Sequence, residues 1–251
     1  MIARAPLTAG AAAAVLRGCC HSSAMKKPQQ PPTPPSETGR EQGLEWARFD
    51  PLNSPVGGVL ILHGAGSRKE NHYDVARLMT AAGLSAICFD QRGHGASDGP
   101  MDERLLEDVV SVAGLFGQLP VGLRGSSMGG FVALGAAQAA NATAVVAICP
   151  TTAAQFGEGV MAGRMGFDAD PEAITSVLDR GEPDPPDVPV LLLHADGDEV
   201  VPVSRSRELA PLLTHEASRY VEVSGGHHRS LQHDPEFVAL SVNFLARHIP
   251  S

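Results

Sequence analysis

Short apolar runs recur along the chain from about residue 43, and turn residues bound most of them. Apolar runs of about four to eight residues between turn signals are typical of strands that are buried on both faces of a sheet. On this pattern, strands are predicted over Leu44–Phe49, Val56–Leu62, Leu84–Phe89, Val121–Leu123, Ala144–Cys149, Val190–Leu193 and Arg219–Val223.

Several stretches between these runs indicate helices by their spacing or composition. Helices are predicted over Tyr73–Ala82, Glu103–Leu119, Phe131–Ala140, Ser204–Leu213 and Pro235–Arg247. Strands that alternate with helices predict an α/β fold, with a mostly parallel central sheet and helices on both faces. Because ligands bind such sheets at the carboxyl ends of the strands, polar residues that directly follow a strand are the first candidates for function.

Residues 1–38 differ from the rest of the chain. Before Glu37 they contain four basic residues and no acid, and residues 28–35 are rich in proline and glutamine. This composition predicts a disordered or targeting tail with an extended linker, followed by one folded domain over residues 39–251. An organellar transit peptide, for a mitochondrion or plastid, and an untargeted tail on a cytoplasmic protein both fit it.

Composition narrows the classes of function. The formal net charge of the 251 residues is −9, which argues against a nucleic-acid partner, since that binding needs a basic face. No apolar run reaches the roughly 20 residues that a membrane-spanning helix needs. The four cysteines show no Cys-x-x-Cys spacing, which argues against a zinc or redox motif, and Cys88 and Cys149 are predicted to be small core residues.

The most informative motif is Gly-x-Ser-x-Gly, which Gly125, Ser127 and Gly129 form between a predicted strand and a predicted helix. A serine on a sharp strand-to-helix turn has its side chain pushed outward, and neighbours two residues away fit best without a Cβ atom. The free N–H groups of the helix would face whatever the serine attacks. A plain Gly/Ser-rich loop is the alternative.

Two glycine-containing loops follow other predicted strands. Glycines in His63–Ser67 let the backbone approach a ligand, although a simple turn is equally consistent with them. The loop Asp90–Ser97 is interpreted as structural, because Asp90 and Arg92 can satisfy the hydrogen bonds of a buried turn.

Two loops rich in acids and histidines come late in the chain. His194–Pro202 resembles half of a calcium loop, but the later ligand positions fail, so one of its carboxylates is interpreted as a partner that orients a histidine. Ser224–Ser230 contributes a pair of histidines that could bind a metal together with His233. No cysteine or His-Glu-x-x-His pattern accompanies them, and a solvated histidine cluster is the other interpretation.

The order Ser…Asp…His, with each residue just past a predicted strand, resembles the α/β-hydrolase superfamily, specifically its compact serine esterase, lysophospholipase and dienelactone-hydrolase-like branch. The resemblance covers about residues 43–251. It implies a serine hydrolase that cleaves a small to medium carboxylic ester or thioester through an acyl-enzyme intermediate, without a cofactor. A non-catalytic binding protein, and a peptidase or lysophospholipase of the same fold, are the alternatives.

The resemblance also assigns roles to single residues. Ser127 would be the nucleophile, His228 the general base and Asp198 the acid that orients it. The backbone N–H groups of Ala65 and Met128 would bind the oxyanion. A serine in the motif, rather than Asp or Cys, argues against a dehalogenase, an epoxide hydrolase or a strict dienelactone hydrolase.

Two of these assignments involve a choice between neighbours. Asp198 is favoured over Asp196 because the family's acid lies just before a Val-x-Pro-like turn. His228 is favoured over His227 because the family often reads Gly-Gly-x-His after its last strand.

Residues 150–188 lie between two predicted strands, where this family commonly inserts a lid. The large apolar residues of this segment are Phe156, Val160, Met161, Met165, Phe167, Ile174, Val177 and Leu178. In one interpretation they form a short helical flap that contacts an acyl chain. In the other they pack onto the sheet.

Overall fold

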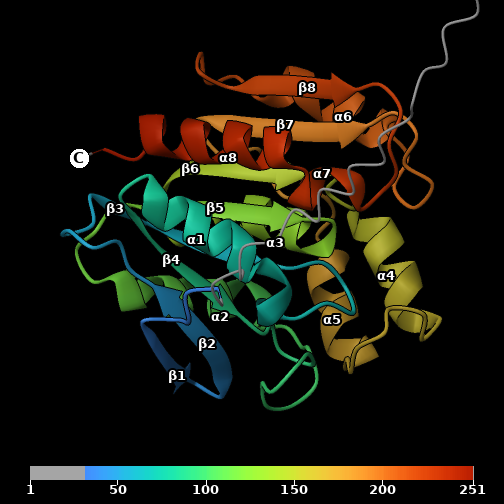
Figure 1. The fold of residues 1–251 in the computed structure, drawn as a ribbon. Coiled ribbons are helices and arrows are strands. Elements are labelled where there is room, and N and C mark those ends of the chain that lie inside the picture. The colour runs from blue at the N-terminus through green and yellow to red at the C-terminus, as the bar shows by residue number, and fades with distance from the viewer. Residues whose placement is uncertain (1–31, 251) are drawn as a thin grey trace, which may run out of the picture. The chain divides into compact units, whose positions relative to one another are not determined.

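A computed structural model describes residues 32–250 of the chain (Figure 1). The predicted tail falls almost entirely outside these residues, so its targeting role stays a prediction. The strands are β1 (Glu37–Glu41), β2 (Leu44–Phe49), β3 (Gly57–Leu62), β4 (Leu84–Phe89), β5 (Val121–Ser126), β6 (Ala142–Ile148), β7 (Val190–Ala195) and β8 (Arg219–Val223).

Eight α-helices lie among these residues. They are α1 (Tyr73–Ala81), α2 (Leu105–Ala113), α3 (Met128–Ala136), α4 (Ala153–Met161), α5 (Pro171–Leu178), α6 (Ser204–Leu209), α7 (Ser230–His233) and α8 (Pro235–His248). Within the described part of the chain, no helix is long and apolar enough to cross a membrane.

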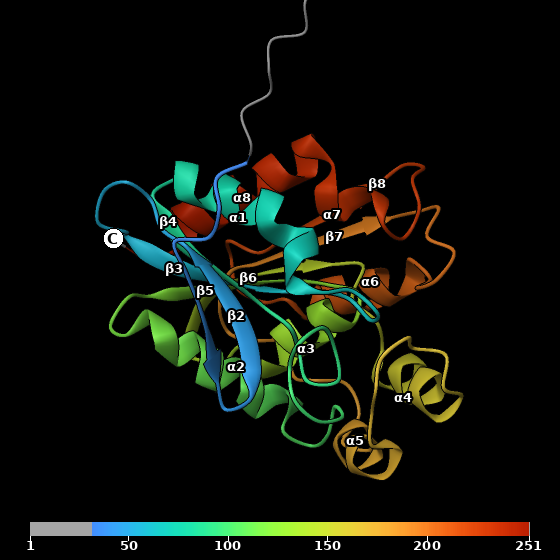
Figure 2. The same ribbon diagram turned by 60° about the horizontal axis from the view of Figure 1, so that its bottom comes forward.

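The strands form one mostly parallel sheet in the order β1-β2-β4-β3-β5-β6-β7-β8. Only the pairs β1–β2 and β2–β4 are antiparallel. Figures 1 and 2 show α1 and α8 on one face of the sheet and α2 and α3 on the other. The predicted α/β architecture is therefore confirmed, and the carboxyl ends of the parallel strands share one edge.

The continuous apolar runs serve two cores. Along β3, Leu60 and Leu62 belong to the core under α2 and α3, whereas Val59 and Ile61 belong to the core under α1 and α8. Successive side chains of a strand point to opposite faces, so a strand that is covered on both sides has to be apolar at every position.

Besides shifts of a few residues at the ends of several elements, three differences from the sequence-based expectation have a clear physical reason. β1 was not predicted, because its residues are mostly polar and it lies at the open edge of the sheet. The helix predicted over Glu103–Leu119 begins at Leu105 and ends at Ala113, where a short 3₁₀ turn over Gly114–Phe116 takes over. α7 was also missed, since four residues are too short to show helical spacing.

The segment 150–188 contains α4 and α5, which lie together at one end of the sheet (Figures 1 and 2). Thr152 forms a capping box with Gln155 at the start of α4, and the Asp170 carboxylate accepts two backbone N–H groups at the start of α5. The side chains of this segment that join the core under α2 and α3 are Phe156, Val160, Ile174, Val177 and Leu178. These side chains pack as the second interpretation expects, while a role of the segment as a lid stays a prediction.

The loop after β4 has the structural role that the sequence predicted for it. The buried Asp90 carboxylate accepts hydrogen bonds from the Lys69 ammonium at 2.7 Å, the Lys69 N–H at 2.8 Å and the Ala96 N–H at 3.0 Å. Burial alone raises the pKa of Asp90, but these hydrogen bonds outweigh it and lower the pKa below its ordinary value. Arg92 forms a second buried pair, with Asp108.

We expect Asp90→Ala to lower the free energy of unfolding by about 3–5 kcal/mol, because it leaves the Lys69 ammonium largely buried without this partner. Urea unfolding at pH 7 measures the change. Asp98→Ala is the matched control, since Asp98 lies in the same loop and its exposed carboxylate pairs with Arg40 on the surface. Equal losses in the two variants would contradict the importance of the buried pair.

Candidate active site

Ser127 occupies a strained turn between β5 and α3. Its φ angle is 54°, a region that residues other than glycine rarely adopt. The Ser127 N–H donates to the Ile148 carbonyl of β6 at 2.8 Å, and the Ser127 carbonyl accepts from the N–H groups of Gly130 and Phe131. These bonds fix the turn from both neighbouring elements, as expected for a serine whose side chain must point away from the sheet edge.

The two glycines of the motif are required by close packing of the backbone. A Cβ atom on Gly125 would lie 2.0 Å from the carbonyl oxygen of Gly129, and one on Gly129 would lie 2.4 Å from the carbonyl oxygen of Leu62. Neither contact is possible for real atoms. The start of α3 can therefore approach β5 and the end of β3 this closely only because both positions lack a side chain.

The loop after β3 lies directly beside the serine. A Cβ atom on Gly64 would come within 3.3 Å of the Ser127 Cβ atom. The Gly66 N–H donates to His94 Nε2 at 3.2 Å. The Gly66 N–H, which follows that of Ala65 in the chain, is thus already bound. Ala65 and Met128 both line the cleft in which Ser127 lies.

Two buried imidazoles connect the loops after β3 and β4 in opposite directions. His94 reaches from the second loop to Gly66, while His63 Nε2 accepts from the Gln91 N–H at 3.1 Å. Burial lowers the pKa of His63 to about 3, helped by the nearby His94, and burial also lowers the pKa of His94. Both rings are therefore neutral at pH 7, which leaves each Nε2 free to accept a hydrogen bond.

The Asp198 carboxylate lies after β7 and is fully buried. One oxygen accepts from the N–H groups of Val200 and Val201, each at 2.8 Å, and the other lies 2.7 Å from His228 Nδ1. His194 Nε2 also lies 3.4 Å from this second oxygen. Burial raises the pKa of Asp198, but the hydrogen bonds from both histidines and from the backbone lower it well below its ordinary value.

The structure separates the neighbouring candidates. His228, and not His227, contacts Asp198, while the His227 ring nitrogen lies against the Arg229 N–H at 3.3 Å. Asp196 instead accepts from the Gly225 N–H at 2.6 Å and ties together the loops after β7 and β8. Sequence reasoning placed His194 at the start of the loop after β7 but gave it no role, because a histidine near the end of an apolar strand carries no functional signal of its own.

Ser127 and His228 line one cleft of about 940 Å³. Its other lining residues include Met165, Glu199, Arg229 and His233, which lie in segments that the sequence singled out, and several that no motif indicated, namely Asn71, Thr151, Gln155, Glu158, Arg164 and Gln232. Most of them are polar, and Met165 is the only large apolar residue that the segment 150–188 contributes to this lining. The whole lining comes from five separate stretches of chain, which only the fold brings together.

Comparisons with known proteins bear on the family to which the chain belongs. Residues 53–165 match the family described as serine aminopeptidase, S33. The chain is 25% identical over 242 residues to a monoacylglycerol lipase of Mycolicibacterium smegmatis, covering 75% of this chain and 86% of that protein. It is 30% identical over 103 residues to an uncharacterized abhydrolase domain-containing protein of Dictyostelium discoideum, covering 39% of this chain but only 11% of that protein.

Solved structures give the same result for the fold. The monoacylglycerol lipase of Paleococcus ferrophilus superposes with a TM-score of 0.67 at 22% identity, covering 82% of this chain and 99% of that one. The chain belongs to the α/β-hydrolase superfamily. The resemblance inferred from the order of Ser127, Asp198 and His228 is thereby confirmed at the level of the superfamily.

Potential metal ligands in the hydrolase overlap only in part with the sets that the sequence suggested, since His194 and Asp198 come from the loop that resembles half of a calcium site. Within residues 32–250, one group of three side chains, Cys149, His194 and Asp198, has its ligand atoms within 4.8 Å of one another. All three are enclosed in the fold, and the Asp198 oxygens are already engaged by N–H donors. The expectation that the protein needs no cofactor stays a prediction.

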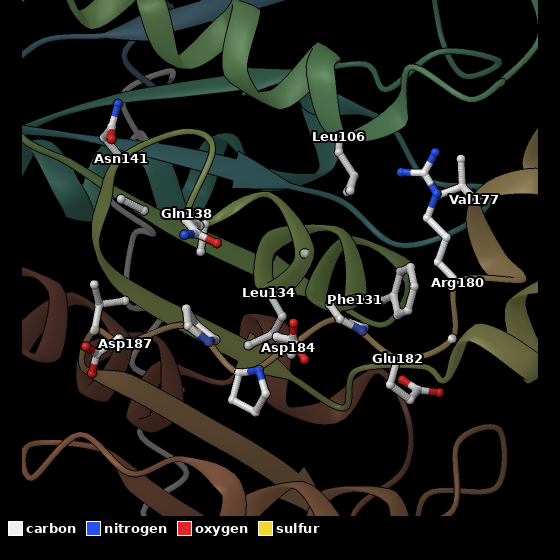
Figure 3. A pocket seen from close by; sticks show the side chains of 18 residues that line it. Leu106, Phe131, Leu134, Gln138, Asn141, Val177, Arg180, Glu182, Asp184 and Asp187 are labelled. Carbon is white, nitrogen blue, oxygen red and sulfur yellow. The ribbon is translucent and has the colours of Figure 1, made fainter.

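A second hollow of about 760 Å³ lies between α3 and residues 177–188. Figure 3 shows Phe131 and Leu134 from α3 in its lining, together with the charged side chains of Arg180 and Asp184. None of the candidate catalytic residues lines it.

We expect Gly125→Ala to abolish folding or to lower the free energy of unfolding by several kcal/mol, roughly the scale of severe overpacking. Gly114→Ala is the matched control, because a Cβ atom on Gly114 meets nothing within 4 Å. Thermal unfolding of both variants checks the expectation, and an unchanged melting temperature for Gly125→Ala would contradict it.

The depressed pKa of His63 predicts a dependence of stability on pH. Between about pH 6.5 and pH 3 the unfolded chain binds a proton that the native state does not, so stability falls as the pH falls, by at most about 1.4 kcal/mol per pH unit. His63→Gln should be less stable at pH 7 but should show a shallower slope between pH 6 and pH 4. Parallel slopes in urea unfolding of the two proteins would contradict this.

Proposed function

We propose that this protein is a serine hydrolase that cleaves a small to medium carboxylic ester, with Ser127 as nucleophile, His228 as base and Asp198 as the acid. Ala65 and Met128 supply the oxyanion N–H groups. The contact between His228 Nδ1 and Asp198 at 2.7 Å carries this proposal, because it orients an imidazole toward the cleft that also contains Ser127.

The Asp198 carboxylate is suited to this role. The N–H groups of Val200 and Val201 hold one oxygen in place, and the lowered pKa keeps the group ionised at neutral pH. An ionised carboxylate on Nδ1 fixes the tautomer in which Nε2 is free to accept a proton, and it stabilises the imidazolium that then forms.

The reaction follows from these positions. His228 Nε2 takes the proton of the Ser127 hydroxyl as the oxygen attacks the ester carbonyl. The oxyanion accepts hydrogen bonds from the Ala65 and Met128 N–H groups, and such donors contribute about 3–4 kcal/mol each to stabilising the transition state. His228 gives its proton to the departing alcohol. Water then attacks the acyl-enzyme by the same steps, which releases the acid and restores the serine.

The lining of the cleft favours a substrate with a polar leaving group. Gln155, Glu158 and Arg164 face it from the segment 150–188, and Glu199 and Arg229 flank His228. Monoacylglycerols fit this description, and two of the similar proteins are monoacylglycerol lipases. A monoacylglycerol with a short to medium acyl chain is therefore the first substrate to test, with thioesters as the second.

Amide hydrolysis is the second candidate, because the matching family is described as a serine aminopeptidase. Glu158 and Glu199 line the cleft and would supply the negative charge that a substrate's amino terminus needs. An aminoacyl p-nitroanilide distinguishes this activity from ester hydrolysis.

We expect a fluorophosphonate probe to label the wild-type protein and to leave Ser127→Ala unlabelled. His228→Ala and Asp198→Asn should label slower by a factor on the order of 10³–10⁴, because the serine loses its base or the base loses its orientation. Labelling rates measured at pH 8 on proteins with matched melting temperatures check this.

The neighbouring residues provide the controls for this experiment. His227→Ala and Asp196→Asn change the same residue types one or two positions away and should label at close to the wild-type rate. An unlabelled, folded wild type would contradict the proposed enzyme, whereas labelling that depends on His227 would contradict only the choice of base. Turnover of monoacylglycerols and p-nitrophenyl esters from acetyl to palmitoyl then gives the acyl preference.

A further inference from the structure

A charged side chain lies buried directly beneath the candidate nucleophile. Arg124 is on β5, three residues before Ser127, and only 1% of its surface is exposed. Burial lowers the pKa of Arg124 to about 10, so the guanidinium still carries its charge at neutral pH. Its Nη2 donates to the carbonyl oxygen of Gln232 at 2.8 Å.

The sheet itself does not need this charge. The neighbouring residue Leu123 and the residue Val146, which pairs with Arg124 on β6, are apolar and buried. Burying an isolated charge is costly, and well-packed apolar side chains of similar volume are often as stable or more stable. The presence of an arginine at position 124 is therefore explained better by its bond to Gln232 than by a contribution to the stability of the sheet.

Arg124 holds a segment that is also tied to the nucleophile strand by a second bond. The Ser126 hydroxyl donates to the Gln232 side-chain oxygen at 3.1 Å. Two β5 residues, three and one positions before Ser127, thus bind the same residue of α7. Figure 1 shows α7 beside the carboxyl ends of the central strands.

The helix α7 continues directly from the loop that carries His228. The Ser230 hydroxyl donates to the His227 carbonyl at 2.7 Å and accepts from the His227 N–H at 3.0 Å. Leu231 anchors the same turn in the core under α1 and α8. The loop and the helix therefore form one unit, and a displacement of Gln232 is transmitted to His228.

The loop after β7 holds the His228 end of this unit, and His233 at the end of α7 also binds the Asp74 carboxylate of α1 at 3.0 Å. Asp198 contacts the His228 ring, and the Glu199 carboxylate accepts from the His228 N–H at 3.3 Å. Those contacts set the distance from the base to the acid. The distance from His228 to Ser127 depends in addition on how α7 is fixed to β5.

We propose that Arg124 is a positioning residue, which fixes α7 and the His228 loop in register with Ser127 on the nucleophile strand. This inference rests on the proposed hydrolase function. Arg124 does not touch the substrate in this role; it acts through Gln232 and His228.

The test compares Arg124→Met with Arg48→Met in the full-length protein. Arg48 is the matched control, because it is also a strand arginine whose Nη1 donates to a backbone carbonyl, that of Leu115, far from the cleft. We expect Arg124→Met to lower kcat for ester hydrolysis about ten- to a hundredfold with little change in KM, as for a misplaced catalytic group. Arg48→Met should change kcat less than about twofold, in line with its distance from the reacting groups.

Two further variants distinguish positioning from general damage. Arg124→Lys keeps the charge and one donor and should recover part of the lost kcat. Ser126→Ala should lower kcat by itself. In the double variant with Arg124→Met, the fold-loss of kcat should differ from the product of the two single fold-losses, because both residues bind Gln232. Independent, multiplicative effects would overturn the shared action through α7.

The outcomes separate this inference from the proposed function. An active wild type together with a folded Arg124→Met protein of wild-type kcat would overturn the role of Arg124 alone. A folded wild type that neither reacts with a fluorophosphonate nor hydrolyses esters would overturn the hydrolase proposal, and this inference with it. Should Arg124→Met fail to fold, Arg124→Lys carries the same comparison.

Discussion

The arrangement of this site depends on how closely the backbone passes itself at residues 125–129. Gly125 and Gly129 leave no room for a Cβ atom, and Ser127 between them holds a positive φ angle. A residue in such a conformation costs about 1–3 kcal/mol, so the surroundings have to enforce it. The bond from Ser127 to Ile148 of β6 and the packing of Gly129 on β3 supply that enforcement. The turn is thereby tied to both strands that flank β5.

Apolar packing explains the sheet, whereas polar contacts explain its functional edge. Each parallel strand leaves the two cores at its carboxyl end and continues as a loop whose backbone groups need partners. Asp90 supplies them after β4, Asp198 after β7 and Arg124 at the junction of β5 and α7. Each of these buried charges is satisfied mainly by backbone groups of a loop rather than by the sheet. Their common effect is to hold separate loops at fixed distances, which a catalytic site requires and a hydrophobic core does not.

The sequence predicted most clearly what depends on a local pattern. β2, β4 and β8 have the predicted bounds, because an apolar run or a run of β-formers between turns specifies a strand by itself. The Gly-x-Ser-x-Gly turn was recognisable because its glycines are imposed by a local clash. The partners that come from distant segments were not predictable from local pattern: His94 on Gly66 and Arg124 on Gln232 are pairings that only the fold creates. β1 was missed because an edge strand needs no apolar face.

The segment 150–188 lines the cleft and also packs into the core under α2 and α3. Moving α4 and α5 away would expose Phe156, Ile174 and Leu178, and each such side chain contributes about 1.5–3 kcal/mol when buried. Between the two helices, Phe167 stacks on His94 with ring centroids 4.2 Å apart, and His94 in turn binds the Gly66 N–H. The segment therefore supports the loop beside Ser127 as well as enclosing the cleft. The same residues therefore stabilise the core, the loop after β3 and the wall of the cleft, so the shape of the cleft depends on packing that the core also needs.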